Sequence, residues 1–506
     1  MRPSQLFVFG FFFFPLYLFA QGQLVLLPGS EKIYYNKRTQ THRLVGTVNF
    51  TYQGNTMYCD SAHYREYQKV VWAYGRVHIA KDDIHIYCDS LKYTGATRTA
   101  QLWGNVRIRD NTYKFASDSV EYNANTGKAI YRRNGRIENS VNNEIITSRI
   151  GYFYPSTGSY FFSGNVVYQK NSLRMTTDTL QFAYEKQTTY FHGPTTIKND
   201  SIEAYCGGGY YLVNKNEGQL RKNVRIYQTE RTILCDTAYY KERNQEFTAK
   251  GHVWIDEKNE HLQLTGDYFN TRNDKPQSLL KGNAMVIESR QKDSLYIQAQ
   301  SIRMLDHEDN HRTLFASPKV RIFSNQLQAI ADSAMYQSKE GLVHLYKSPI
   351  LWSNNAELKG DTVRMVLKDS LVEQVSVTGN ATTIIAVDTG KYYNQLSGKR
   401  IISYVNNNEI TKAEVKGNAW TVYYPIEDVE EDTVVIRKRI GMNRLYASDL
   451  VVFLKEGEVD RITYLDKPDG IFYPMDKIDE KEKFIKNFSW NPGKRPRRPN
   501  VSRKYR

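Results

Sequence analysis

The chain has 506 residues, of which 40% are hydrophobic and 13% aromatic, and it carries a formal net charge of +15 at pH 7. After residue 20 no window approaches about 18 consecutive apolar residues, which excludes a membrane-spanning helix in the rest of the sequence. The basic balance, with a pI near 9.3, indicates an anionic partner.

Residues 1–20 have the pattern of a secretory signal peptide. Arg2 supplies a positive charge, an apolar run extends from Leu6 to Phe19, and Ala20 precedes a polar segment. The run of about fourteen apolar residues is too short for a stable membrane span. We therefore expect a cleaved leader and an exported protein. Nucleic acid is not expected as a partner there, whereas anionic lipid head groups and phosphorylated saccharides fit the charge.

Residues 70–95 show the unit from which most of the sequence is built. Apolar and polar side chains alternate as in a half-buried strand, then Lys81, Asp82 and Asp83 turn the chain, and the alternation resumes on the return. After Asp89 the parity of the apolar positions shifts by one residue. Because such a shift would send all later side chains to the other face, the backbone must bulge there. We expect this crease in alternate strands, where it folds the ribbon into a V.

An aspartate stands at this parity shift in unit after unit. Asp, Ser and Thr bend or end strands through hydrogen bonds to nearby backbone groups, and this structural role is favoured here. A ladder of calcium sites would need carboxylates clustered with glycines in a tight loop, whereas these aspartates occur once per unit within strands. The residues concerned are Asp60, Asp89, Asp118, Asp178, Asp236, Asp332 and Asp361.

A Gly-x-Val step marks the units and recurs at intervals of 29 or 31 residues from Gly46 to Gly282. Beyond Gly282 the pattern loosens, and Ser-Pro or Gly-Asn-Ala stands in the same place. A period of this size is typical of a protein in which each unit packs only against its neighbours. About thirteen units predict about 26 strands in one continuous repeat region, residues 24–466, with a possible seam near residues 288–316.

The last segment, residues 467–506, departs from the repeat. Residues 474–486 predict one short helix, whereas convincing helical periodicity is absent elsewhere. The basic tail from Lys494 to Arg506 is polar and interrupted by prolines, so we expect it to be disordered.

All four cysteines stand directly before an aspartate of the repeat. Cys59 and Cys88 are 29 residues apart, as are Cys206 and Cys235. In a series of antiparallel hairpins such residues lie two strands apart, roughly 9.5 Å, which exceeds the limit of about 7 Å for a disulfide. In a parallel β-helix with one coil per unit they would stack. Two turns per unit favour the antiparallel arrangement, so no disulfide is expected.

No group of side chains in the sequence converges on a catalytic or metal site. His78 and His85 flank a hairpin turn and can face each other across it, but the repeat fixes no third ligand. His307 and His311 have helical metal-ligand spacing but lie in an acidic loop without the glutamate of a zinc-protease motif. We expect a protein that is not an enzyme and that needs neither a metal nor a cofactor.

In the order of these features the sequence resembles the OstA-like family. This family comprises the organic-solvent-tolerance proteins related to LptA and to the periplasmic domain of LptD. A signal peptide precedes a serial run of short strands with Gly-x-Val and Asp-Ser steps, from about Val45 to about Leu465. The matching stretches are residues 58–64 (Tyr-Cys-Asp-Ser-Ala-His-Tyr), residues 73–77 (Ala-Tyr-Gly-Arg-Val) and residues 102–108 (Leu-Trp-Gly-Asn-Val-Arg-Ile). The chain is longer than a single LptA-type domain, and its end differs from that of LptD-type proteins.

The resemblance implies an all-β fold, an elongated repeat β-jellyroll of consecutive, mostly antiparallel strands in the periplasm, with association to the outer membrane as a further possibility. It also implies a non-enzymatic protein that shields the acyl chains of lipopolysaccharide in an apolar groove during transport to the outer membrane. The implied partners are lipopolysaccharide with its lipid A, other jellyroll transport proteins, and a second copy of the chain. Proteins would pair through free edge strands, expected at residues 33–35 or residues 450–454.

No motif marks the groove, so the candidate groove residues follow from the inward parity alone. For each of them, filling a core is the simpler interpretation. The candidates are Val77, Ile79, Ile84, Ile86, Leu91, Tyr93, Val106, Ile108, Phe115, Val120, Tyr122, Val166, Leu180 and Phe182.

The alternative hypothesis is a structural or adhesive β-solenoid at the cell surface that transports no lipid. The two hypotheses differ in whether the apolar interior is open to hydrocarbon chains. An open groove should take up a fluorescent fatty acid or lipid A, whereas a closed solenoid should show no saturable uptake.

Overall fold

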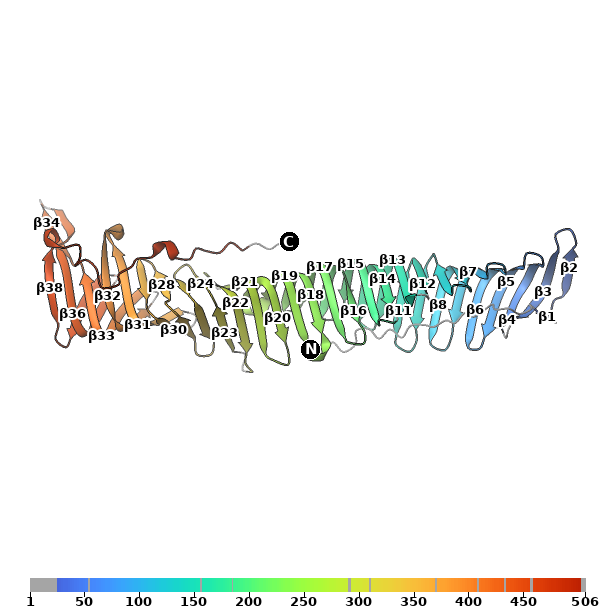
Figure 1. Cartoon of the computed structure of the whole chain (residues 1–506), viewed down its shortest axis with the longest axis horizontal. Helices are drawn as coiled ribbons and strands as arrows, with labels where there is room; N and C mark the ends of the chain where they lie inside the picture. Colours follow the sequence, from blue (N-terminus) through green and yellow to red (C-terminus); the bar gives the residue numbers. More distant parts are fainter. Residues whose placement is uncertain are drawn as a thin grey trace. The chain divides into compact units, whose positions relative to one another are not determined.

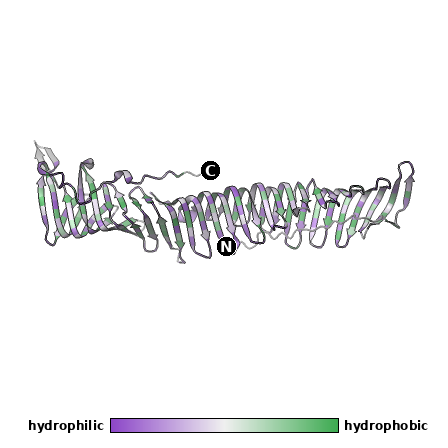
Figure 2. Ribbon diagram, viewed as in Figure 1, coloured by the Kyte–Doolittle hydropathy of each residue, from purple (hydrophilic) through white to green (hydrophobic). Residues whose placement is uncertain are grey.

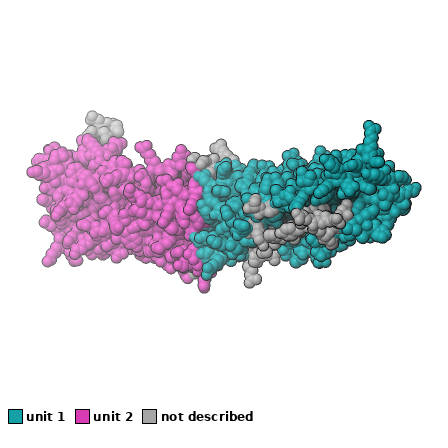
Figure 3. Space-filling view, turned by 45° about the vertical axis from the view of Figure 1, so that its right-hand side comes forward, with its two compact units in different colours: residues 1–247 teal, residues 248–506 magenta. Residues whose placement is uncertain are grey.

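The structure is a computed structural model that describes residues 25–52, 55–154, 157–183, 185–289, 293–308, 311–368, 371–406, 409–431, 434–455 and 458–501. The expected signal peptide, residues 1–20, lies outside these residues. Contacts divide the chain into two compact units, residues 1–247 and residues 248–506 (Figure 3). No helix among the described residues is long and apolar enough to cross a bilayer.

Unit 1 is built from antiparallel strands that, with few exceptions, pair in the order of the sequence (Figure 1), which confirms the predicted all-β fold. Its strands are β1 Val25–Leu27, β2 Lys32–Asn36, β3 Thr41–Tyr52, β4 Asn55–Arg65, β5 Val70–Lys81, β6 Ile84–Thr94, β7 Thr99–Arg109, β8 Tyr113–Asn123, β9 Lys128–Tyr131, β10 Gly135–Asn139, β11 Glu144–Ser148, β12 Ile150–Tyr154, β13 Ser159–Lys170, β14 Leu173–Ala183, β15 Thr188–Lys198, β16 Ile202–Leu212, β17 Glu217–Gln228 and β18 Arg231–Lys241, followed by the 3₁₀ turn η2 Glu242–Asn244.

Unit 2 continues the same pattern from β19, whose first two residues precede the boundary. Its elements are β19 Glu246–Glu257, η3 Lys258–Glu260, β20 Leu262–Arg272, β21 Gln277–Ser289, β22 Ser294–Asp306, β23 Arg312–Ser317, β24 Val320–Phe323, β25 Gln328–Ala331, β26 Ser333–Gln337, β27 Leu342–Tyr346, β28 Ile350–Ser353, β29 Ala356–Lys359, β30 Thr362–Lys368, β31 Leu371–Val387, η4 Asp388–Gly390, β32 Tyr392–Asn406, β33 Glu409–Tyr423, β34 Ile426–Glu431, β35 Val434–Arg439, β36 Gly441–Lys455, β37 Glu458–Leu465, β38 Asp469–Pro474, η5 Met475–Lys477 and η6 Pro492–Lys494. β34 and β35 form a separate hairpin.

Several strands are interrupted near their middle and are therefore labelled as two. β9 and β10 both pair with β8, and β11 and β12 both pair with β13. The strands from β23 to β30 are divided in the same way. These interruptions raise the number of labelled strands above the expected 26 without changing the order of the hairpins.

The β5–β6 hairpin shows the register that the repeat imposes. Ile79 lies opposite Ile86, and Ile86 lies opposite Ile108 of β7 on its other side. β5 therefore separates Cys59 of β4 from Cys88 of β6, as expected for antiparallel hairpins. Both thiols are buried, and this burial raises the pKa of each to about 12, so they remain protonated.

A bulge interrupts the register near the middle of most full-length strands, not only in alternate ones. Between β6 and β7 the regular pairing stops at Tyr87 and resumes at Ser90, and between β7 and β8 it stops at Trp103 and resumes at Val106. Gly104 (φ +74°) and Asn105 (φ +48°) are both left-handed, a conformation that glycine and asparagine tolerate best. The crease expected in alternate strands is therefore present, but the strands between them carry a bulge as well.

The repeat aspartates do support the bulge, but their partners differ from those expected. Asp89 accepts a hydrogen bond from Asn105 Nδ2 of the next strand at 2.9 Å, and Asp118 accepts one from Asn134 at 2.9 Å. In the first unit the left-handed residue is Arg76, and its Nη2 donates a hydrogen bond to Asp60 Oδ1 at 2.7 Å. These carboxylates thus bind the side chain of the left-handed residue across the sheet, and the expected local backbone contact is not their main interaction.

The bulge divides each strand into two halves, and we name the two resulting surfaces wall A and wall B. In β5 and β6, wall A comprises residues 77–81 and 84–88, and wall B comprises residues 70–74 and 90–94. Apolar and polar positions alternate along the ribbon (Figure 2). Ile79 and Ile86 of wall A are buried, as are Ala73 and Leu91 of wall B, so both walls turn one apolar row inward.

The C-terminal segment does not form the expected helix, and residues 494–501, the described part of the expected disordered tail, bind to the sheet. A 3₁₀ turn, η5, occupies residues 475–477, and irregular chain follows with η6 at residues 492–494. Residues 478–501, which we name the strap, cross the strands of unit 2 from β36 towards β22 (dark red in Figure 1). The prediction of disorder rested on the polar composition of this segment. It was wrong for the described residues because the sheet supplies hydrogen-bonding partners for the polar groups.

Those partners stand on one outward row of wall A. Gln395 binds the strap backbone twice, since its amide oxygen accepts from Ile485 N at 3.0 Å and its Nε2 donates to Lys483 O at 2.8 Å. Glu357 is fully buried, and it accepts hydrogen bonds from Asn491 N at 2.8 Å and from Trp352 Nε1 at 3.1 Å.

The later strap residues continue along the same row. Arg495 donates to Gln328 Oε1 at 2.6 Å, and Arg498 donates to the Tyr296 hydroxyl at 3.1 Å. Ile485 packs into a small core with Val422 and Met442. The strap therefore converts an outward face of the sheet into a second buried layer.

The outermost strands of the described sheet lie at β1 and β2 in unit 1 and at β37 and β38 in unit 2. Every residue of β2 is exposed, with Ile33 and Tyr34 exposed by 56% and 54%. In the described residues β37 and β38 pair only with β36. Residues 450–454 lie in β36, which pairs with β33 on one side and with β37 on the other. The prediction of an edge there was therefore wrong, because the strands of residues 458–474 cover it.

Gly104→Ala should destabilise unit 1 by at least about 1–2 kcal/mol, the cost of a left-handed alanine. Its Cβ would also clash with Asp89 Oδ2. The control Gly218→Ala places a Cβ no closer than 3.3 Å to a neighbour and should be near neutral. Hydrogen exchange under urea measures the first effect at residues 99–123 and the second at residues 202–228, and an equal change of protection in the two variants would contradict the role given to the bulge.

Ile485→Ala should loosen the strap, because removal of a buried isoleucine side chain costs about 2–5 kcal/mol. Ile485 is 3% exposed, whereas the neighbouring Lys486 points to solvent, so Lys486→Ala is the matched control. We expect faster amide exchange in β32 and β33 for the first variant only. An unchanged exchange rate in these strands would show that the strap does not stabilise them.

Candidate functional site

The candidate groove residues of unit 1 face the interior that the parity predicted. Ile84, Tyr93 and Phe115 are half-buried. The remaining eleven are buried at 8% exposure or less: Val77, Ile79, Ile86, Leu91, Val106, Ile108, Val120, Tyr122, Val166, Leu180 and Phe182.

The strand register aligns these residues in rows. On wall A, Ile86 lies opposite Ile108, which lies opposite Phe115. On wall B, Leu91 lies opposite Leu102, which lies opposite Val120. The rows cross the strands at right angles, so each strand adds one apolar side chain per row at a spacing of about 4.8 Å. Unit 1 thereby presents apolar stripes along its sheet, with few interruptions.

One interruption of the apolar rows is a buried ion pair in wall A. Lys170 Nζ lies 2.8 Å from Glu144 Oε1, and both side chains are at most 10% exposed. Burial raises the pKa of Glu144, and Lys170 opposes part of that shift. Burial also raises the pKa of Tyr168, with the Glu144 charge as a second cause. Removing one partner of a buried ion pair lowers the stability of a protein by several kcal/mol. We therefore expect both residues of this pair to be needed for the stability of unit 1.

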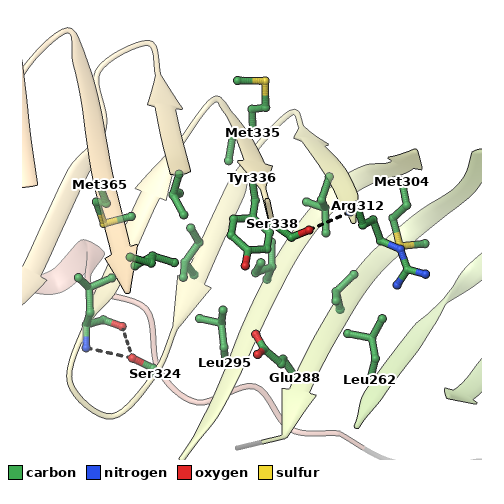
Figure 4. A pocket seen from close by; sticks show the side chains of 18 of the residues that line it. Leu262, Glu288, Leu295, Met304, Arg312, Ser324, Met335, Tyr336, Ser338 and Met365 are labelled. Carbon is green, nitrogen blue, oxygen red and sulfur yellow. Dashed lines mark hydrogen bonds between the residues drawn. The ribbon is translucent and has the colours of Figure 1, made fainter. Parts of the chain in front are cut away.

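Unit 2 contains an apolar cavity of about 260 Å³ between the two walls (Figure 4). An engineered apolar cavity of about 150 Å³ already binds benzene. Wall A contributes the side chains of Leu262, Val286, Leu295, Ile297, Ile322 and Leu327, and wall B contributes Met304, Leu314, Ala334, Tyr336, Val343, Met365, Leu367 and Val372. Side chains of both walls therefore face one another across an open space large enough for part of a hydrocarbon chain.

Charged and polar groups lie at one end of this cavity. Glu260, Glu288, Arg312 and Ser338 belong to its lining, and the last three are labelled in Figure 4. Arg312 pairs with Asp306 at 2.6 Å and with Glu260 at 2.9 Å, and its backbone N–H donates to Ser338 Oγ at 2.8 Å. The cavity is thus apolar inside and charged at one end, an arrangement that suits an amphipathic molecule.

Sequence reasoning missed every residue of this cavity. The candidate groove residues all come from residues 77–182, where the Gly-x-Val step keeps the parity in phase. Around the cavity the step is replaced by Ser317-Pro318 and Ser348-Pro349, and the strands are divided into short pieces. The inward alternation of Leu262 with Leu264, and of Leu295 with Ile297, was the available signal.

The histidines form no metal centre. His78 Nε2 and His85 Nδ1 do face each other at 3.2 Å, and His78 stacks on Tyr87 with ring centroids 4.5 Å apart. Partial burial, with His85 and Arg109 nearby, lowers the pKa of His78. His307 binds Thr313 Oγ1 at 2.9 Å. Within the described ranges no group of three or more His, Cys, Asp or Glu side chains is placed to hold a metal ion.

Comparison with known proteins agrees with this geometry. The family described as OstA-like protein matches residues 23–178. The family described as LptA/(LptD N-terminal domain) LPS transport protein matches residues 146–296 and 232–371. No curated protein sequence matches the chain.

One similar solved structure is LptH from Pseudomonas aeruginosa, described as the LptA homologous periplasmic component of the lipopolysaccharide transport device. It is 18% identical, the match covers 21% of this chain and 82% of that one, and the TM-score is 0.20. The two family matches together span residues 23–371, across the bulged hairpins described above. The chain therefore belongs to the OstA-like family, which includes LptA and the N-terminal domain of LptD.

Proposed function

We propose that the chain is a non-enzymatic bridge that shelters the acyl chains of lipopolysaccharide between its two walls during transport to the outer membrane. The observation that carries this proposal is that each unit turns apolar side chains inward from both walls, with a cavity of about 260 Å³ between the walls in unit 2. In this proposal residues 24–466 act as one repeat region in the periplasm, after cleavage of residues 1–20.

The energetics of such binding follow from apolar burial. Each methylene group of an acyl chain that leaves water contributes about 0.8 kcal/mol. Successive positions of a row, such as Ile79, Ile86 and Ile108, offer similar apolar surfaces at each strand. An acyl chain would therefore bind with similar affinity at one strand and at the next. Its movement along the row then needs no chemical step.

The outward surface supports an anionic lipid as the cargo. The outward row of wall A in unit 1 includes the cations Arg109, Lys114, Arg174 and Lys198, together with the carboxylates Glu138 and Glu203. These cations belong to the excess that gives the chain its net charge of +15. Phosphorylated head groups outside the apolar interior would meet this positive field.

Photocrosslinking tests the interior directly. A photoreactive residue at the inward positions Ile86, Val106 or Ile297 should label lipopolysaccharide. Ile297 lines the cavity of unit 2, and Ile86 and Val106 are buried side chains that face inward from their strands in unit 1. The outward controls Tyr87, Arg107 and Arg321 lie next to inward positions on the same strands. Equal labelling at inward and outward positions, or no saturable labelling at all, would refute lipid binding and favour the surface solenoid.

We further propose that the chain meets another jellyroll protein, or a second copy of itself, through its edge strands. β2 is exposed along its whole length, and in β38 Ile471 and Phe472 are 56% and 47% exposed. Unpaired strand edges bind other strands unless charge or a covering segment prevents it. These two strands are therefore the proposed contacts for head-to-tail assembly.

Charge on an edge should abolish this assembly. Ile33→Asp combined with Tyr34→Asp, or Ile471→Asp combined with Phe472→Asp, should lower the sedimentation coefficient of the associated species to that of the monomer. Tyr67→Asp is the control, because Tyr67 is 88% exposed but lies in a turn. If the edge variants sediment like the wild type at every concentration, edge pairing is excluded.

A further inference from the structure

The outward face of wall B in unit 1 carries an uncharged row that includes five aromatic rings and two amides. The strand register places one member on each of eight strands, from β9 to β18: Ile130, Tyr152, Phe161, Gln181, Tyr190, Tyr210, Gln219 and Tyr239. All eight are half-buried, and the next residue along the strand faces inward in the clearest cases, such as Phe162 and Phe191. The row is therefore an external surface, separate from the proposed lipid path.

Other parts of the same wall differ in composition. In the first strands of unit 1 the row contains Arg43, Lys92 and Glu121. In unit 2 the equivalent row includes Arg303 and Arg364. An ordinary solvated face of this fold thus carries charges, so the uncharged stretch from Ile130 to Tyr239 needs its own explanation.

The rings of this row lie next to one another on neighbouring strands, and we name the row from Ile130 to Tyr239 the platform. Tyr152 and Phe161 are stacked, with centroids 5.1 Å apart and an interplanar angle of 20°. Tyr190 and Tyr210 lie 6.3 Å apart on adjacent strands, and their rings are tilted by 55°. Small outward residues such as Ser159 and Ala183 flank the row, and a hollow of about 510 Å³ opens beside Tyr190.

Polar groups surround that hollow. Gln181 and His192 line it from the sheet, Glu185 and Lys186 from a turn, and Arg221 from β17. Amide side chains both donate and accept hydrogen bonds, and two of the rim groups are cationic. Tyr190 supplies a phenol ring to the lining of this hollow, and a hollow with apolar surface and a few convergent polar groups is typical of a ligand site.

We propose that this platform binds an extended glycan that lies across the strands. Sugar rings present apolar C–H faces that stack on tyrosine and phenylalanine, while their hydroxyl and N-acetyl groups suit Gln181 and Gln219. The strand spacing of about 4.8 Å is close to the length of one sugar unit, so successive sugars meet successive strands. The site faces away from the interior, so its occupant is a polysaccharide strand of the cell envelope and not the sugar part of a lipid held between the walls.

Titration of the mature full-length chain with a hexamer of β-1,4-linked N-acetylglucosamine, followed by calorimetry, tests this proposal. We expect saturable binding that Tyr190→Ala or Tyr210→Ala weakens at least tenfold. The matched controls are Phe315→Ala and His344→Ala, which lie on the equivalent row of unit 2, and they should leave the affinity unchanged.

Two results would overturn the proposal. One is the absence of saturable heat with the hexamer, and the other is an equal loss of affinity in the platform and control variants. Amide exchange of residues 188–212 in the Tyr190→Ala variant should equal that of the wild type, which shows that the altered strand and its neighbour are folded. Lipopolysaccharide crosslinking from Ile86 should also be unchanged, which separates this site from the lipid path.

Discussion

The bulge near the middle of most full-length strands is the constraint on which the interior depends. Side chains alternate between the two faces of a strand, so any insertion into the register decides which residues face inward beyond it. Glycine followed by asparagine accepts the left-handed backbone that the bulge requires, and an aspartate on the neighbouring strand binds the asparagine. Because the bend lies at the same level in successive strands, one sheet supplies both walls of the apolar interior.

The sequence predicted the inward rows well because parity is a local property. The shift after Asp89 correctly brought Leu91 inward together with Ile86. The bulge in the Gly-x-Val strands remained hidden for a physical reason: it inserts two residues, Gly75 and Arg76, and an even insertion leaves the parity unchanged. A one-residue insertion is visible in the sequence pattern, whereas a two-residue insertion is not.

The strap could not be predicted because its contacts join residues about 90 to 200 positions apart. In the sequence, Asn491 and Arg495 have the polar character of solvated residues. Only the folded sheet shows that Glu357 accepts a hydrogen bond from Asn491 and that Gln328 accepts one from Arg495. A compositional signal did exist in the outward row of wall A. In unit 1 that row carries charges such as Arg109 and Lys114, whereas in unit 2 it carries Trp352, Ile384 and Val422, which are buried.

The strap also sets the order in which unit 2 can mature. Because residues 478–501 follow in the sequence every strand that they cover, the hairpins of unit 2 can complete their ladder while Trp352 and Ile384 still contact water. A chain cut before residue 478 would then display a bare apolar stripe on an otherwise finished sheet. An exposed stripe of this kind makes a protein a substrate of chaperones and proteases, so docking of residues 478–501 protects unit 2 from both.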